Sequence, residues 1–184
     1  DHTGTVRFFG KPLGEVRRKV AYMPQVAAVD WDYPITVEQV VTMGMYTELG
    51  WLHRANAAHR SRVMEVLDRV GIADLAKRQI SELSGGQRRR VFVARILVQA
   101  PELYLLDEPF AGVDAASERV IRGVLRELRD QGATIVIVHH DLSTVAELCD
   151  HVTILNREII ATGPTSEAFT RENITKAFGL GLLE

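Results

Sequence analysis

The 184-residue sequence has little of several features that would place it in a particular class of protein. It contains a single cysteine, Cys149, so an internal disulfide is excluded and a reducing compartment fits. Its formal net charge is −2, so no excess of positive charge indicates binding to nucleic acid or anionic lipid. No apolar run approaches the roughly 18–20 residues that a membrane-spanning helix needs. The first residues, Asp1–Gly4, do not resemble a secretory signal.

A short apolar run, Leu103–Asp107, is followed by a second carboxylate, Glu108. Such a run is typical of a buried parallel strand, and open α/β sheets bind ligands at the carboxyl ends of their strands. A second run, Thr134–Val138, predicts another fully buried strand that brings His139 and His140 to the same edge. Successive strand residues point to opposite faces, so the two histidines are poorly suited to binding one metal ion. Alone, such an acidic pair is more often an ordinary strand end than a functional site.

The segment Leu83–Gln87 places a serine and two glycines ahead of a helical pattern that reaches about Gln99. Backbone N–H groups are exposed at such a helix start, and they attract phosphate. Ser84 and Gln87 also form the pattern of a capping box, which needs no ligand. Three arginines follow, Arg88–Arg90, and in a chain of negative net charge we interpret them as a solvated or salt-bridged helix face.

Taken together and in this order, these segments resemble the nucleotide-binding subunit of an ABC transporter. The resemblance covers essentially the whole chain, and the positions that carry it are Gln25 (Q-loop), Leu83–Gln87 (signature motif), Leu105–Pro109 (Walker B), Asp114 (D-loop) and His140 (H-switch). It implies an α/β fold with a P-loop ATPase-type parallel sheet core, formed by residues 1–25 and 81–184. An α-helical subdomain, residues 26–80, is inserted into this core.

The resemblance also implies ATP and Mg²⁺ as cofactors and a role for each motif residue. Asp107 would hold Mg²⁺ through water, Glu108 would act as the general base, and His140 would orient the attacking water on the γ-phosphate. Gln25 would contact the Mg²⁺ region and sense a transmembrane partner. The residues implied to contact ATP bound to the opposite protomer of a head-to-tail homodimer are Ser84, Gly85, Gly86 and Gln87, with Asp114 coupling the two sites.

One element of that family is missing, because no G-x-x-x-x-G-K-[ST] segment occurs in the sequence. Gly10–Pro12 cannot replace it, since it lacks the upstream glycine and its proline has no N–H. Asp1–Gly4 resembles the loop shortly after the P-loop helix, which implies that the Walker A strand and helix precede residue 1. We therefore expect residues 1–184 to be inactive alone, and the absence of that strand and helix to expose one flank of Leu103–Asp107.

Residues 26–80 read as helices rather than strands. A capping box at Thr36–Gln39 opens a helix to about Tyr46, the spacing of His59–Val70 predicts a second helix, and Ala73–Arg78 predicts a third. The bulky residues of this region are Trp31, Tyr33, Met43, Met45 and Trp51. We expect most of them in the core and some on an apolar surface that docks onto membrane-embedded subunits.

The other expected elements follow from local signals. The strands are 4–9, 20–23 and a hairpin around Asn156–Arg157, and the helices are 115–130, capped by Asp114, and 142–149, which contains Cys149 as a small buried hydrophobe. Two short helices complete the chain.

The transported ion can be inferred only from the resemblance of this sequence to the manganese, zinc and iron uptake branch of the family. The segments that carry it are Val29–Val37, Gly50–Trp51 and Asn156–Ile160. The implied protein lies on the cytoplasmic face of the membrane with permease subunits, reaches a solute-binding protein indirectly and binds no nucleic acid. An alternative is a soluble ABC-type ATPase acting on DNA or ribosomes, but the long coiled coils or tandem cassettes of those proteins are missing here. A third class, a non-catalytic interaction module, is disfavoured by the intact Glu108 and His140.

Overall fold

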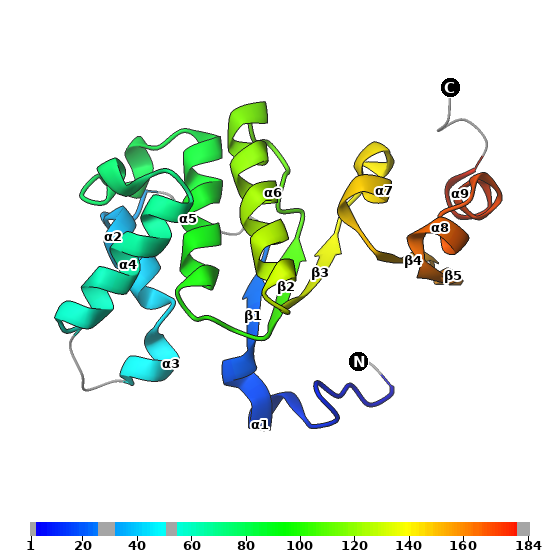
Figure 1. The fold of residues 1–184 in the computed structure, drawn as a ribbon, viewed down its shortest axis with the longest axis horizontal. Helices are drawn as coiled ribbons and strands as arrows, with labels where there is room; N and C mark the ends of the chain where they lie inside the picture. The colour runs from blue at the N-terminus through cyan, green and yellow to red at the C-terminus, as the bar shows by residue number, and fades with distance from the viewer. Residues whose placement is uncertain (1–2, 26–31, 51–54, 180–184) are drawn as a thin grey trace. The chain divides into compact units, whose positions relative to one another are not determined.

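A computed structural model of the chain describes residues 3–25, 32–50 and 55–179 (Figure 1). The chain divides into two compact units, Asp1–Val138 and His139–Glu184, and each is described by itself. Among the described residues, no helix combines the length and the apolar character that crossing a membrane would require.

The first unit is built on a parallel sheet of three strands. These are β1 (Val20–Met23), β2 (Leu103–Asp107) and β3 (Thr134–Val138), in the order β1-β2-β3. Tyr22 pairs with Leu105 and Leu105 with Val136, while Asp107 at the end of β2 lies opposite Val138. The three predicted strands of this sheet are therefore confirmed. The expectation that β2 has an open flank is wrong, because it is hydrogen-bonded on both sides.

Within the first unit, the described helices cover one face of this sheet. The buried face carries Ala21, Met23, Tyr104 and Leu106, each at most 2% exposed. Helices α5 (Gly85–Leu97) and α6 (Ala115–Asp130) pack against it, with α5 contacting β1 and α6 contacting β3 (Figure 1). On the other face Tyr22, Val136 and Val138 are 58%, 48% and 60% exposed. The prediction that Thr134–Val138 is fully buried is therefore wrong, since alternate side chains point to an uncovered face.

The two covering helices begin and pack as their sequences predict. Ser84 caps α5 and Asp114 caps α6, each accepting a hydrogen bond from a backbone N–H in the first turn. The residues that α6 buries are Ile121, Val124, Leu125 and Leu128, which recur at helical spacing along one stripe.

The stretch between β1 and α5 contains two of the three predicted helices, while the third, Ala73–Arg78, is only a 3₁₀ turn. The stretch comprises α2 (Val37–Met43), α3 (Tyr46–Leu49), α4 (Ala57–Arg69) and short 3₁₀ turns at Ala73–Leu75 and Ile80–Glu82. Thr36 and Asn56 cap α2 and α4 with complete capping boxes. Of the bulky residues singled out above, Met45 is buried, Tyr33 and Met43 are 60% and 56% exposed, and Trp31 and Trp51 lie outside the described residues.

The amino-terminal segment departs from expectation. Residues 4–9 form no strand but only an isolated antiparallel bridge between Phe8 and Lys11. The alternation in this segment has no neighbouring strand to pair with, so its side chains stay largely exposed. The chain then enters the short helix α1 (Leu13–Val16) and a 3₁₀ turn at Arg17–Lys19 before β1.

The second unit is an antiparallel hairpin with short helices. Its elements are a 3₁₀ turn at Leu142–Thr144, α7 (Val145–Leu148), β4 (His151–Asn156), β5 (Glu158–Pro164), α8 (Thr165–Ala168) and α9 (Arg171–Phe178). Ile154, Ile174 and Ala177 form a small core. The predicted hairpin is confirmed, with Arg157 in a left-handed conformation at its tip. Cys149 is half-buried rather than buried, and burial raises the pKa of its thiol.

Candidate functional site

The acidic pair lies at the carboxyl end of β2, the edge at which parallel sheets bind ligands. Asp107 is partly buried, and Glu108 follows it in a left-handed backbone conformation with φ 49°. The Glu108 N–H donates to the carbonyl of Val138 at 3.0 Å, and its own carbonyl accepts from the N–H of Ala111 at 3.2 Å. The turn after β2 therefore fixes the backbone that carries the second carboxylate.

The signature segment forms the start of α5. Ser84 Oγ accepts from the Gln87 N–H at 3.3 Å, and Gln87 Oε1 accepts from the Ser84 N–H at 2.9 Å. This capping box is complete without a ligand, as one of the two interpretations predicts. Ser84 and Gly85 are nevertheless exposed, so this end of the 13-residue helix is open to an anion.

Gly86 brings the start of α5 directly against the start of α6. A Cβ at this position would lie 2.3 Å from Asp114 Oδ2 and 2.5 Å from Ser117 Oγ, so a larger residue would displace these two hydrogen-bonded side chains. Asp114 is itself held by Ser117, whose N–H and hydroxyl each donate to its carboxylate at 2.8 Å. These hydrogen bonds lower the pKa of Asp114. The proposed signature and D-loop residues are thus neighbours within one chain.

The arginine run is not a uniformly solvated face. Arg88 donates to the carbonyl of Ser81 and Arg90 to the carbonyl of Gly71. Arg89 is only 4% exposed, which corrects the prediction for that residue. The reason is the helical period, because Arg89 lies on the face of α5 that also carries Gly86.

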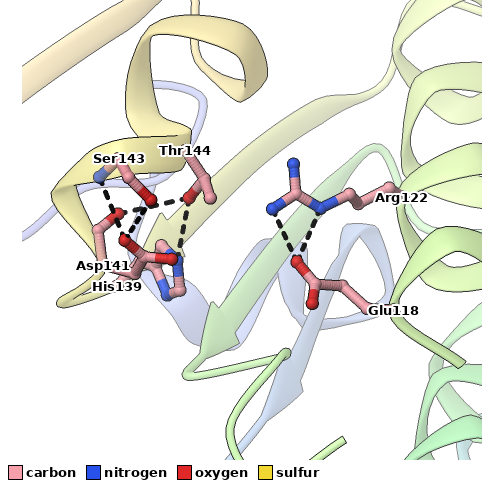
Figure 2. Close-up of polar contacts among 6 residues, drawn as sticks. All are labelled: Glu118, Arg122, His139, Asp141, Ser143 and Thr144. Atoms are coloured by element: carbon pink, nitrogen blue, oxygen red, sulfur yellow. Dashed lines mark hydrogen bonds and ion pairs between the residues drawn. The ribbon is translucent and has the colours of Figure 1, made fainter. Parts of the chain in front are cut away.

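A charged pair on α6 lies beside the turn after β2. Glu118 and Arg122, one helical turn apart, are joined by two hydrogen bonds of 2.9 and 2.6 Å (Figure 2). The guanidinium of Arg122 also lies over the ring of Phe110, 5.2 Å from its centroid. Phe110 is buried two residues after Glu108, so this stacking anchors the same turn.

In the second unit, a tight turn surrounds the two histidines. Asp141 Oδ1 accepts from the backbone N–H and the hydroxyl of Ser143, and Thr144 Oγ1 lies 3.1 Å from His139 Nε2 (Figure 2). His140 is exposed beside His139, with ring centroids 5.7 Å apart. Over the described ranges, no three His, Cys, Asp or Glu side chains come together as a metal-binding group.

The donor set at β2 and α5 fits part of a magnesium–nucleotide complex. Carboxylate oxygens such as those of Asp107 and Glu108 are the ligands that Mg²⁺ prefers, and the open start of α5 suits a phosphate. Gln25 is exposed just after β1 and Pro24. The sequence contains no P-loop pattern to hold the remaining phosphates.

Two features of this site escaped sequence reasoning. The left-handed conformation of Glu108 has no signal in the sequence, because an acidic residue rarely adopts it. The burial of Arg89 could have been suspected from its spacing to Gly86 and Val93 on α5, which are buried too.

Comparisons with known proteins identify the family. The family model described as ABC transporter matches residues 1–111. The zinc transport system ATP-binding protein TroB of Treponema pallidum is 51% identical over 96% of this chain, and the manganese transport system ATP-binding protein MntB of Bacillus subtilis is 46% identical over 96%. The matches cover 66% and 71% of those two proteins, so the chain spans about two thirds of their length.

Solved structures show the same fold. A chain of an ABC transporter in an inward-facing conformation has a TM-score of 0.80 at 28% identity, covering 87% of this chain and 63% of that one. The ADP conformation of an ATP-binding cassette has a TM-score of 0.68 at 24% identity, covering 90% of this chain and 68% of that one. The α/β core with a parallel sheet is therefore the fold of ATP-binding cassettes.

Proposed function

The chain belongs to the ABC transporter family, and we propose that the intact protein is the ATP-hydrolysing subunit of a transporter that imports a divalent metal ion. The observation that carries this proposal is the conformation of Glu108. It follows Asp107 at the carboxyl end of a parallel strand, and the turn after β2 holds its backbone in place. A general base needs such fixed placement against the water that it activates.

Bound Mg-ATP would supply the phosphoryl group and the metal charge that the reaction needs. Asp107 would hold the metal, and Glu108 would accept the proton of the attacking water. His140 would donate a hydrogen bond toward the γ-phosphate, which an imidazole can do in either protonation state. Gln25 would contribute its amide, which both donates and accepts without adding charge.

The signature residues would act on a nucleotide held by a second copy. The open start of α5 presents its N–H groups to an anion, and the residues in this role are Ser84, Gly85, Gly86 and Gln87. Asp114 packs against Gly86 and would couple the two sites of a head-to-tail homodimer. ATP would then join the protomers, and hydrolysis would release them.

A permease is the proposed partner, bound through residues 26–80 on the cytoplasmic face of the membrane. Tyr33, Met43 and Tyr46 are 60%, 56% and 69% exposed in this region, which supports an apolar docking surface. A solute-binding protein would be reached only indirectly, through the permease.

The proposed cargo is manganese, zinc or iron, because the relatives are named for zinc and manganese transport. The cargo would pass through other chains, so no residue here is assigned to it. The same names favour a transporter over the alternative of an ATPase acting on DNA or ribosomes.

The test replaces the base in the intact protein. Glu108→Gln keeps the shape of the side chain but cannot accept a proton, so ATP turnover should fall by about 100-fold or more. An ATP-bound dimer should accumulate on size-exclusion chromatography. Glu102→Gln is the matched control, since it alters an exposed carboxylate at the opposite end of the same strand and should leave turnover unchanged. Turnover near the parent rate in Glu108→Gln would remove the assignment.

A further inference from the structure

Arg89 is a buried charge at a position where the sequence predicts a solvated helix face. It is 4% exposed and shares the inward face of α5 with Gly86 and Val93. Burying a charged group costs several kcal/mol unless other groups compensate it. The contacts of this guanidinium therefore show what its burial achieves.

Those contacts lead to Glu108 through the backbone. Arg89 Nη2 donates to the carbonyl of Ala111 at 3.1 Å, and the Ala111 N–H donates to the carbonyl of Glu108 at 3.2 Å. The Glu108 N–H donates in turn to Val138 on β3 at 3.0 Å. Glu108 is thus tied at its N–H to the sheet and at its carbonyl to Ala111, and Arg89 ties Ala111 to α5.

This arrangement explains how Glu108 keeps a strained backbone. A residue other than glycine is strained in the left-handed region, where Glu108 lies with φ 49°. Such strain persists only where the surrounding structure fixes it from several sides. The sheet supplies one fixed side, and the chain of hydrogen bonds from Arg89 supplies the other.

Charge supports the same pairing. Burial lowers the pKa of Arg89, while the carboxylates of Glu108 and Asp107 raise it, and an arginine stays protonated under either influence. Arg89 Nη1 is also buried, and it has no hydrogen-bond partner within the part of the chain that the structure describes. The guanidinium therefore places a positive charge near the acidic pair in addition to bonding the turn.

We propose that Arg89 is a positioning residue for ATP hydrolysis, which links the helix that begins with the signature segment to the turn that holds Glu108. The inference rests on the proposed function, because it takes Glu108 as the base. Arg89 need not touch the nucleotide. It keeps the carboxylate aligned for the hydrolytic step, and it ties that alignment to the helix that would contact the other protomer's ATP.

The test compares Arg89→Gln and Arg89→Lys with the parent in the intact protein. A misaligned base should lower kcat for ATP by about 10- to 100-fold while KM stays within about twofold. Arg89→Lys, which keeps the charge and one donor, should recover part of the loss. Arg88→Gln is the matched control, because it removes a neighbouring charge that bonds Ser81 rather than the turn. A kcat within about twofold of the parent in Arg89→Gln would overturn the proposal.

A second readout separates positioning from general support of the fold. When Arg89→Gln is combined with Glu108→Gln, the ATP-dependent dimer should form as it does for Glu108→Gln alone. Loss of that dimer would mean that Arg89 supports nucleotide binding or folding, which overturns the proposal. Should Arg89→Gln fail to fold, hydrogen exchange on Arg89→Lys decides instead. In Arg89→Lys, backbone amides of residues 108–114 should exchange faster than in the parent, while those of α4 should exchange at the parent rate. Equal protection of residues 108–114 in the variant and the parent would contradict the inference.

The two proposals fail in different ways. Near-parental turnover in Glu108→Gln would end the proposed function and this inference with it. If Glu108→Gln accumulates the ATP-bound dimer and Arg89→Gln keeps the parent kcat, the inference about Arg89 fails but the proposed function stands.

Discussion

At the scale of single residues, close packing restricts which side chains the candidate site can hold. Gly86 is the clearest case, because any side chain there would meet the carboxylate of Asp114 and the hydroxyl of Ser117. Ser117 is 1% exposed, so its hydroxyl cannot simply move into solvent. Glycine at this position therefore has a packing role in addition to its place in the proposed phosphate-binding segment.

Gly86→Ala should destabilise the protein by about 1–3 kcal/mol, the usual cost of forcing extra volume into a packed contact. Gly123→Ala, within α6, is the control, since a Cβ there meets nothing within 4 Å. It should stabilise by about 0.5–1 kcal/mol, because alanine loses less backbone freedom in a helix. Urea denaturation gives the free energy of unfolding of both variants. Equal changes in the two variants would refute the packing argument.

Because of Asp114, the stability of the folded protein should vary with pH in the acid range. Hydrogen bonds from Ser117 lower its pKa in the folded state, so its contribution is complete above the ordinary aspartate pKa and is lost as pH falls through the lower, folded-state pKa. Asp114→Ala should therefore lower Tm at pH 7, and this difference should shrink as pH falls below about 4. Asp130→Ala, at the opposite end of α6, should not lower Tm at pH 7, because a carboxylate there faces the negative end of the helix. A pH-independent difference for Asp114→Ala would contradict this assignment.

At the scale of elements, the helices between β1 and α5 carry the proposed docking surface. Met43→Glu and Tyr46→Glu replace exposed apolar side chains, so they should preserve the fold and abolish co-purification of the intact protein with its permease. Leu155→Glu is the control, because Leu155 is also 60% exposed but lies on β4. Unchanged co-purification of the first two variants would remove the docking surface from this region.

The elements that the sequence predicts well are those with local signals. Helix α6 is predicted at 115–130 and found there, because Asp114 caps its start and apolar residues recur at helical spacing. The sheet was harder to predict, since which face is covered depends on elements distant in the sequence. Val136 and Val138 read as buried but are exposed for that reason.

The sequence proposes the residues of the site but does not predict their geometry. The motif order indicates which acids, glycines and histidine to examine. It does not indicate that Glu108 is left-handed or that Arg89 is buried, because both are local exceptions that the surrounding structure imposes.

At the scale of the whole molecule, the described residues would supply one part of the proposed nucleotide site. The acids at the end of β2 and the open start of α5 suit the γ-phosphate and its metal. The backbone cradle and lysine of a P-loop, which wrap the α- and β-phosphates, have no counterpart in the sequence. Binding of ATP by residues 1–184 should therefore be weak, and hydrolysis should be undetectable.

The most direct measurement is titration calorimetry with Mg-ATP on residues 1–184 and on the intact protein under the same conditions. We predict micromolar binding by the intact protein and no comparable binding by residues 1–184. Micromolar binding by residues 1–184 alone would show that the triphosphate is held by residues other than those assigned here, and would contradict the account.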